Sequence, residues 1–217
     1  MPDNTPERWL DWCKRISAGY LPGGDRSLTY HTGVIIAENL IARGFLVPGD
    51  RILDVGSGNG RLAMGLAAVE FPCSYTGLEV IAPCVTFCTQ AFAGFDWFRF
   101  VHLDLQVEHY WPKGKGDPGR VVYPVPDRSI DKVLALSMFS HTGTVRAARR
   151  NLGQMYRVLA PGGAAFTTWY LGPRDADEAK TVYPQEWVEG WFVDLGLAYE
   201  PVDWEIGKQS VYLLRKE

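Results

Sequence analysis

The chain has 217 residues, of which 47% are hydrophobic and 22% are charged. These values are typical of a globular protein with a full core, so we expect one domain without disordered tracts. With 22 Lys and Arg against 25 Asp and Glu, the formal net charge is −3. This charge predicts no basic surface for a nucleic-acid backbone and disfavours a nucleic-acid partner.

The N-terminal part of the sequence predicts helices rather than a targeting segment. The start, "MPDNTPERWL", lacks the basic and then apolar pattern of a secretory signal, and no apolar run reaches the roughly 20 residues of a membrane helix. We therefore expect a cytoplasmic protein with no membrane partner. Apolar residues at helical spacing predict one helix around residues 9–16 and a second over residues 27–43, ended by Gly44. Residues 1–48 would form a helical cap on a core made by residues 49–217.

From residue 51 onward, short β-rich apolar runs alternate with helical stretches. The expected strands are residues 51–56, 74–80, 98–105, 129–139, 164–171, 197–205 and 210–216, and the expected helices are residues 60–70, 83–93, 144–159 and 184–195. Such alternation is typical of parallel strands joined by crossover helices. We predict an α/β fold with a doubly wound, mostly parallel sheet of seven strands, in which the last two strands pair antiparallel.

One connection departs from this alternation. Residues 106–127, "QVEHYWPKGKGDPGRVVYPVPD", are rich in Gly and Pro and lack helical periodicity. A loop of this length in a compact domain is often functional, so we expect it to take part in binding.

The glycines of "ILDVGSGNGRLA" follow the first strand, at the edge where a parallel sheet binds its ligands. Gly56 and Gly58 allow a tight turn and a close approach of the backbone to a ligand, and Gly60 would let the next helix start against the strand. A dinucleotide fingerprint would have a third glycine where this sequence has Arg61. Nicotinamide or flavin binding is therefore disfavoured.

Three motifs resemble one enzyme family. "LDVGSGNGR", with Asp54 two residues before the first glycine, resembles the signature loop of class I S-adenosylmethionine-dependent methyltransferases. "SIDKVLALSMFSH" is similar to the family's "S-F-D-x-V" run, and "MYRVLAPGG" to its "R-V-L-K-P-G-G" element. The resemblance covers about residues 52–169 and implies that S-adenosyl-L-methionine is the cofactor.

The resemblance also implies which residues hold the cofactor. Glu79, at the end of the second strand, would grip both ribose hydroxyls, and Asp104, at the end of the third, would lie near the adenine. The whole expected cofactor set is Asp54, Gly56, Ser57, Gly58, Asn59, Gly60, Arg61, Glu79, Val80, Asp104, Leu105 and Ser137.

Methyl transfer needs a nucleophile held in line with the sulfonium methyl group and, for a hydroxyl or ammonium acceptor, a base. His141, in "SMFSHTG" after the fourth strand, is the first candidate for this catalytic base, and the alternative is that it caps a helix or packs a loop. His31 and His109 are weaker candidates. The aromatic side chains that could line an acceptor pocket, if they do not simply pack, are Tyr20, Tyr30, Tyr110 and Tyr170.

The acceptor is predicted only in outline. Base-methylating members of the superfamily carry an Asn- or Asp-Pro-Pro-aromatic motif after strand four, where this sequence has "LSMFSH". The run from "HYWPKGKG" to "SMFSH" is instead similar to methyltransferases of small metabolites and natural products, whose acceptor would be closed in by residues 106–127 and the N-terminal helices. Three alternatives stay open: a protein methyltransferase, an aminopropyl transferase, and a non-catalytic protein that binds S-adenosylmethionine or S-adenosylhomocysteine.

A metal site is not predicted. The four cysteines, Cys13, Cys73, Cys84 and Cys88, are too few and too irregular for a disulfide framework. Cys84 and Cys88 are one helical turn apart, but no further Cys or His completes a ligand set at the usual spacing. The sequence indicates no oligomeric state.

Overall fold

The computed structural model describes residues 26–172, 181–206 and 208–217. The helix expected around residues 9–16 and the side chain of Tyr20 lie outside these residues. The chain divides into two compact units, one up to Leu103 and one from Asp104, and each is described by itself. No helix of the described ranges is both long and apolar enough to cross a membrane.

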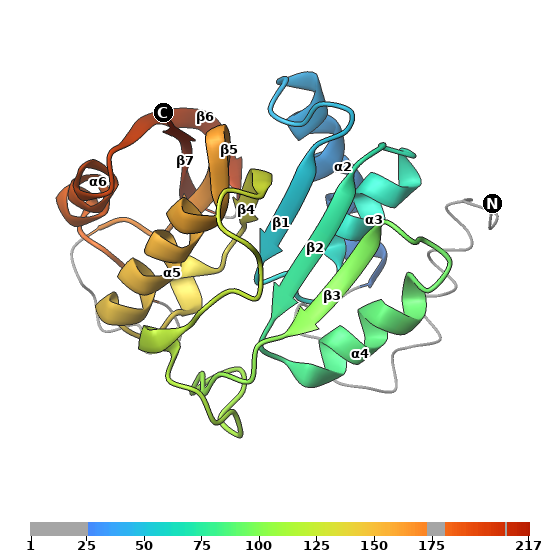
Figure 1. Ribbon diagram of the computed structural model, residues 1–217, viewed down its shortest axis with the longest axis horizontal. Coiled ribbons are helices and arrows are strands. Elements are labelled where there is room, and N and C mark those ends of the chain that lie inside the picture. The colour runs from blue at the N-terminus through green and yellow to red at the C-terminus, as the bar shows by residue number, and fades with distance from the viewer. Residues whose placement is uncertain (1–25, 173–180, 207) are drawn as a thin grey trace. The chain divides into compact units, whose positions relative to one another are not determined.

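The first unit is a parallel three-stranded arrangement with its helices. Its elements are α2 (Arg26–Ala42), β1 (Arg51–Val55), α3 (Arg61–Ala68), β2 (Ser74–Glu79), α4 (Ala82–Ala91) and β3 (Phe98–His102). β2 pairs with β1 on one side and with β3 on the other, and the arrows of all three run the same way in Figure 1. Four of the five residues of β1 are buried, as expected of a parallel strand covered on both faces.

Helices α2 and α3 cross at two glycines. A Cβ atom placed on Gly65 would lie 2.0 Å from the carbonyl oxygen of Gly33, and one on Gly33 would lie 2.2 Å from that of Arg61. Both neighbours are backbone atoms, which cannot turn away as a flexible side chain would. The two helices can approach this closely only because neither glycine carries a side chain.

We expect Gly65→Ala to lower the free energy of unfolding by about 1–3 kcal/mol, because the added methyl group forces α2 and α3 apart. Gly153→Ala is the matched control: Gly153 is also helical, in α5 (Val145–Val158), but a Cβ there meets nothing within 4 Å. Its better helix propensity should leave stability unchanged or raise it by up to about 1 kcal/mol. Denaturant unfolding of both variants measures the difference, and equal stabilities would contradict the account of the crossing.

The second unit contains β4 (Ile130–Ala135), α5, β5 (Leu159–Trp169), α6 (Gln185–Asp194), β6 (Leu197–Ile206) and β7 (Gln209–Lys216), with short 3₁₀ helices at Pro118–Arg120 and Phe139–His141. β5 is parallel to β4, whereas β7 is antiparallel to both β5 and β6. Over the described residues the strand order is β3-β2-β1-β4-β5-β7-β6. The predicted α/β fold with a seven-stranded sheet and an antiparallel final strand is thus confirmed.

Several predicted strand boundaries are wrong, among them the end of β4, which lies at Ala135 and not at residue 139. β3 ends at His102, not at residue 105, because the backbone at Asp104 and beyond pairs with Gly116: the Gly116 N–H donates to the Asp104 carbonyl over 2.8 Å. β5 begins at Leu159, directly after α5, although "APGG" was expected to separate helix and strand. A register shift opposite residues 130–132 accommodates these extra residues within the strand.

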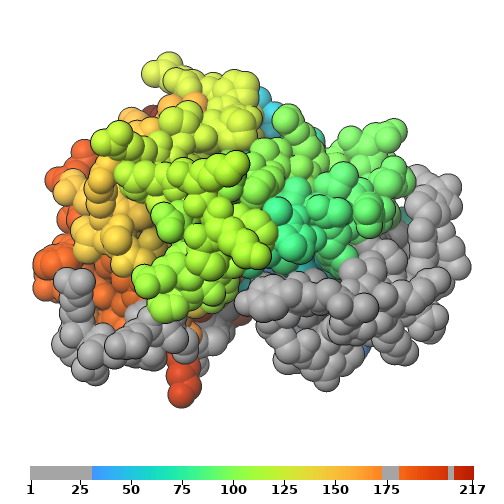
Figure 2. Space-filling model, turned by 90° about the horizontal axis from the view of Figure 1, so that it is seen from below, coloured from blue at the N-terminus to red at the C-terminus, as the bar shows by residue number. Residues whose placement is uncertain are grey.

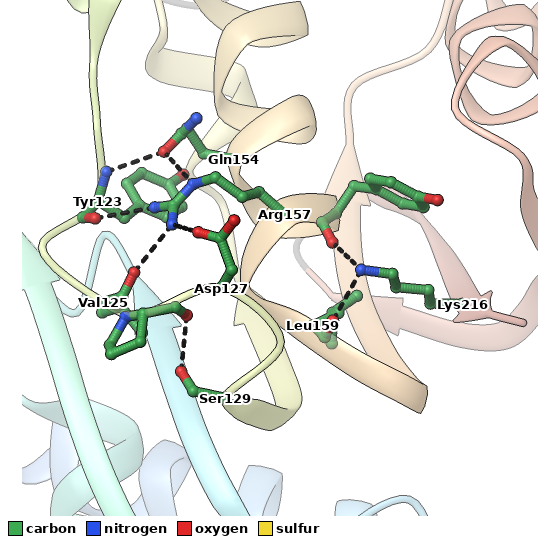
Figure 3. A network of polar contacts seen from close by, with 10 residues as sticks. Tyr123, Val125, Asp127, Ser129, Gln154, Arg157, Leu159 and Lys216 are labelled. Carbon is green, nitrogen blue, oxygen red and sulfur yellow. Dashed lines mark hydrogen bonds and ion pairs between the residues drawn. The ribbon is translucent and has the colours of Figure 1, made fainter.

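The C-terminal strand also completes helix α5. The Lys216 ammonium donates to the carbonyl of Tyr156 over 2.7 Å and to that of Leu159 over 2.8 Å (Figure 3). A cation at this end of a helix is favourable, because the last carbonyls have no partner within the helix. Burial lowers the pKa of Lys216, and the charge of Arg128 acts in the same direction.

Candidate functional site

The glycine loop follows β1 and closes over the end of β2. Gly56 and Ser57 both donate their N–H groups to the carbonyl of Leu78, over 2.8 and 3.1 Å. Gly56, Gly58 and Gly60 have φ values of 78°, 55° and 80°, which L side chains rarely adopt. A Cβ on Gly58 would meet no atom within 4 Å, so the backbone is open to a ligand there.

Gly60 has a packing role in addition to the expected one. A Cβ at this position would lie 3.0 Å from the Sγ atom of Cys88 and 3.3 Å from the Phe92 ring. Both residues belong to α4 and its C-terminal end. The third glycine therefore makes room for α4, and it is also the N-cap residue of α3.

Glu79 ties the glycine loop to the end of β2. One carboxylate oxygen accepts from the N–H of Gly58 over 2.7 Å, and the other accepts from Val80 over 2.7 Å and from Ile81 over 2.9 Å. Burial raises the pKa of Glu79, and the three N–H donors oppose that rise. Since an ionised carboxylate offers about four acceptor positions, Glu79 keeps acceptor capacity for a further donor.

Asp54 lies buried near the end of β1, 4% exposed, where the Tyr75 hydroxyl donates to it over 2.6 Å. Burial raises the pKa of Asp54 to about 6, while the Tyr75 hydrogen bond and the charge of Arg61 act in the opposite direction. Burial also lowers the pKa of the Arg61 guanidinium, and the charge of Asp54 counters this. A buried carboxylate, Asp54, and a half-buried guanidinium, Arg61, therefore lie on either side of the glycine loop in the sequence.

The raised pKa makes Asp54 a source of pH-dependent stability. Between about pH 4 and about pH 6 the folded chain holds a proton on Asp54 that the unfolded chain has released, so this contribution to stability is lost as pH rises. Asp54→Asn does not titrate and keeps an oxygen for Tyr75. We therefore expect the unfolding free energy of Asp54→Asn, minus that of the wild type, to increase by about 3 kcal/mol between these two pH values. Denaturant unfolding at several pH values measures the gap, and a constant gap would contradict the assignment.

Ser57 supplies a group that points to a ligand. Among the described residues, its hydroxyl oxygen is the buried side-chain polar atom that has no hydrogen-bond partner. A Cβ on Gly77 would approach this oxygen to 2.8 Å, so the glycine in β2 makes room for the hydroxyl. An unmet hydroxyl, a carboxylate with spare acceptor capacity and an open glycine backbone together fit a ligand with sugar hydroxyls and a polar tail.

In the second unit, Ser137 is held in a strained conformation after β4. Its φ is 60°, which is uncommon for a residue other than glycine. Its N–H donates to the Thr168 hydroxyl over 2.7 Å, the Gln209 amide donates to its hydroxyl over 2.8 Å, and Thr168 donates to Gln209 over 2.8 Å. This closed ring of hydrogen bonds from β5 and β7 fixes the chain where it leaves β4.

His141 lies four residues further on, in the 3₁₀ helix Phe139–His141, and meets a residue of the long connection. The Tyr110 hydroxyl lies 3.0 Å from His141 Nδ1, and the two ring centroids are 4.7 Å apart. His31 and His109 are exposed. The sequence suggested both Tyr110 and His141, but no spacing signal could pair residues so far apart in the chain.

The connection after β3 is more ordered than its composition predicts. The Arg157 guanidinium, from the "RVLAPGG" motif, donates to the carbonyls of Tyr123 and Val125 over 2.9 and 3.0 Å and pairs with Asp127 (Figure 3). Arg150 donates to Val121 over 2.6 Å. Figure 2 shows the yellow-green residues of this connection at the surface beside the yellow-orange residues of α5. The arginines of α5 thus brace residues 121–127.

The start of the same connection is packed through its glycines. A Cβ on Gly114 would lie 2.0 Å from the carbonyl oxygen of Leu105, and one on Gly116 would lie 2.9 Å from that of Asp104. The Asp104 side chain is exposed and Leu105 is half-buried. Their expected contacts with an adenine ring stay predictions.

Two of the described cysteines have the character of packed thiols. Cys84 and Cys88 are fully buried, and burial raises the pKa of Cys84 to about 12. Within the described ranges, no three His, Cys, Asp or Glu side chains gather as metal ligands would. That the protein uses no metal stays a prediction.

The strand order, the left-handed glycine loop after β1 and the carboxylate that ends β2 together define a class I S-adenosylmethionine-dependent methyltransferase. A family model described as "Methyltransferase domain" matches residues 53–165, and the chain belongs to this family. It is accordingly an enzyme of the methyltransferase class.

Solved structures share the fold at low sequence identity. A SAM dependent methyltransferase from Aquifex aeolicus is similar with a TM-score of 0.59 and 19% identity, over 94% of this chain and 97% of that one. Magnesium protoporphyrin IX methyltransferase from Synechocystis PCC 6803, solved with bound SAM, is similar with a TM-score of 0.60 and 14% identity, over 99% and 93%. The CurJ carbon methyltransferase has a TM-score of 0.58 and 15% identity, and the chain covers 53% of its length while 84% of the chain is matched.

Proposed function

We propose that this enzyme transfers the methyl group of S-adenosylmethionine to an oxygen or nitrogen atom of a small molecule. The observation that carries the proposal is the hydrogen bond between Tyr110, in the connection before β4, and His141, after β4. A hydroxyl or ammonium acceptor must lose a proton when it is methylated, and an imidazole is suited to take it near neutral pH.

In this proposal Glu79 and the glycine loop hold the ribose of the cofactor. Glu79 accepts from a ribose hydroxyl with the acceptor position that its three backbone donors leave, and the Ser57 hydroxyl gains a partner. Gly56, Asn59, Val80 and the other residues of the loop contribute backbone contacts. Asp54 and Arg61 set the charge next to the glycine loop.

Three further residues are assigned to the cofactor by the family resemblance. Asp104 and Leu105 are assigned to the adenine, and Ser137 to the cofactor near the reacting methyl group. When bound, S-adenosylmethionine supplies a methyl group that the sulfonium already activates. The protein has to orient the acceptor, exclude water and accept one proton, which His141 takes on its ring.

A small acceptor is favoured by the braced connection between β3 and β4. Arg150 and Arg157 fix residues 121–127 through hydrogen bonds to their carbonyls, so this part of the connection is held in one conformation. The fold itself does not choose the acceptor, because structures of this fold carry names as different as a carbon methyltransferase and a porphyrin methyltransferase. The acceptor has to be found by experiment.

The test is an assay of S-adenosylhomocysteine release with three sets of acceptors: small molecules that carry hydroxyl or amine groups, an unfolded protein mixture, and nucleic acid. We expect release that depends on a member of the first set. Release only with the protein mixture would support the alternative of a protein methyltransferase. Cofactor binding without release in any set would favour the non-catalytic alternative.

A further inference from the structure

The contact between Tyr110 and His141 joins two segments that are each held rigidly. Tyr110 lies in a tight turn, in which the Trp111 N–H donates to the Val107 carbonyl over 2.7 Å and the Val107 N–H donates to the Trp111 carbonyl over 3.2 Å. Gly114 then packs directly on the backbone of Leu105. The position of the phenol ring is therefore set by backbone contacts on both sides of it.

The His141 side is fixed by four separate contacts. The Phe139 ring stacks on Trp169 with centroids 3.8 Å apart, and the N–H of His141 donates to the Met138 carbonyl over 3.0 Å. The Ser140 hydroxyl donates to the carbonyl of the strained Ser137 over 2.8 Å. On the other side of His141, the hydroxyl of Thr142 lies 2.6 Å from that of Tyr183. These contacts fix the short 3₁₀ helix that carries the His141 imidazole.

The hydrogen bond restricts what the imidazole can do. A neutral histidine ring carries one N–H and one lone pair, and the partner of one nitrogen decides the role of the other. A phenol hydroxyl can either donate or accept. If Tyr110 donates to Nδ1, then Nε2 carries the proton and cannot act as a base. If Tyr110 accepts from Nδ1, then Nε2 carries the lone pair.

We infer that Tyr110 is a positioning residue that accepts a hydrogen bond from Nδ1 of His141 and so keeps the lone pair on Nε2. The inference rests on the proposed function, because only a base role for His141 requires that lone pair. When the acceptor is methylated, its proton passes to Nε2, and the imidazolium that forms keeps its Nδ1–H bond to the Tyr110 oxygen. The phenol stays protonated throughout, so Tyr110 acts through His141 and takes no proton itself.

The test reads the His141 ring directly and needs no acceptor. Long-range ¹H–¹⁵N NMR spectra of the ¹⁵N-labelled full chain, recorded where the imidazoles are neutral, distinguish the Nδ1–H form from the Nε2–H form. His141→Asn identifies the His141 signals among those of the four histidines. We expect the Nδ1–H form to dominate in the wild type, and its ratio to the other form to fall about five-fold in Tyr110→Phe, as loss of one net hydrogen bond predicts.

Tyr183→Phe is the matched control, because it removes a hydroxyl that contacts Thr142 but not the imidazole. It should leave the His141 signals in the Nδ1–H form. A dominant Nε2–H form in the wild type would overturn the inference, even if the variants failed to fold, and so would a Tyr110→Phe spectrum like that of the wild type. Titration with S-adenosylhomocysteine, monitored in the same samples, separates the two claims: absence of binding refutes the proposed function, whatever the ring shows.

Discussion

Glu79→Ala is expected to weaken the binding of S-adenosylmethionine by at least ten-fold. A charge-assisted hydrogen bond to the ribose would be lost, and such a bond is stronger than one between neutral groups. The structure adds a second cause. Glu79 is the acceptor for the N–H groups of Gly58, Val80 and Ile81, so its removal also leaves the glycine loop without its anchor.

Glu79→Gln separates these two causes. The amide keeps an oxygen for Val80 and Ile81 but turns an NH₂ group toward the N–H of Gly58, so most of the loop should be retained while the charge is lost. Glu38→Ala, which changes an exposed glutamate on α2, is the control for the assay. Calorimetric titration measures all three, and an unchanged dissociation constant for Glu79→Ala would refute the ribose assignment.

His141→Ala is expected to slow methyl transfer by roughly a hundred-fold and to leave the affinity for the cofactor intact, because general bases contribute rate factors of this size or more. The second unit supplies the geometry for this role through the Tyr110 contact. The measurement is the rate of S-adenosylhomocysteine formation with an acceptor found in the screen, at saturating cofactor.

His109→Ala is the matched control for that substitution, since His109 belongs to the same unit and is exposed. It should keep the wild-type rate. If His141→Ala stays within a few-fold of the wild type, His141 has a packing role only. In that case the acceptor must lose its proton to water or to another group.

The fold was predictable because its local signals agree with one another. Thr144 was expected to begin a helix, and in the structure its hydroxyl accepts from the Ala147 N–H over 3.1 Å at the start of α5. Alternating apolar runs gave the strands of both units and the antiparallel pairing of β6 with β7. The end of β3 was placed wrongly because the backbone pairing of Asp104 with Gly116 leaves no local sequence pattern. The start of β5 was placed wrongly because the register shift after Leu159 leaves none either.

The candidate site was predictable only where a motif marks it. The glycine loop and Glu79 could be found from their order in the sequence, whereas the backbone donors to Glu79 and the unmet hydroxyl of Ser57 depend on how the loop folds. Likewise, Arg157 lies in the "MYRVLAPGG" motif, but its hydrogen bond to the carbonyl of Tyr123 results from tertiary packing and could not be predicted. Pairs such as Tyr110 and His141 need the three-dimensional arrangement of the second unit.

The central claim is that the glycine loop and Glu79 bind S-adenosylmethionine and its product. The most direct test is calorimetric titration of the wild-type chain with S-adenosylhomocysteine, which is stable during the measurement. The account predicts one site per chain with a dissociation constant of about 1 μM or lower, a binding free energy of about −8 kcal/mol or stronger. A titration with no heat of binding at any temperature tested, confirmed by an unchanged melting temperature, would contradict it.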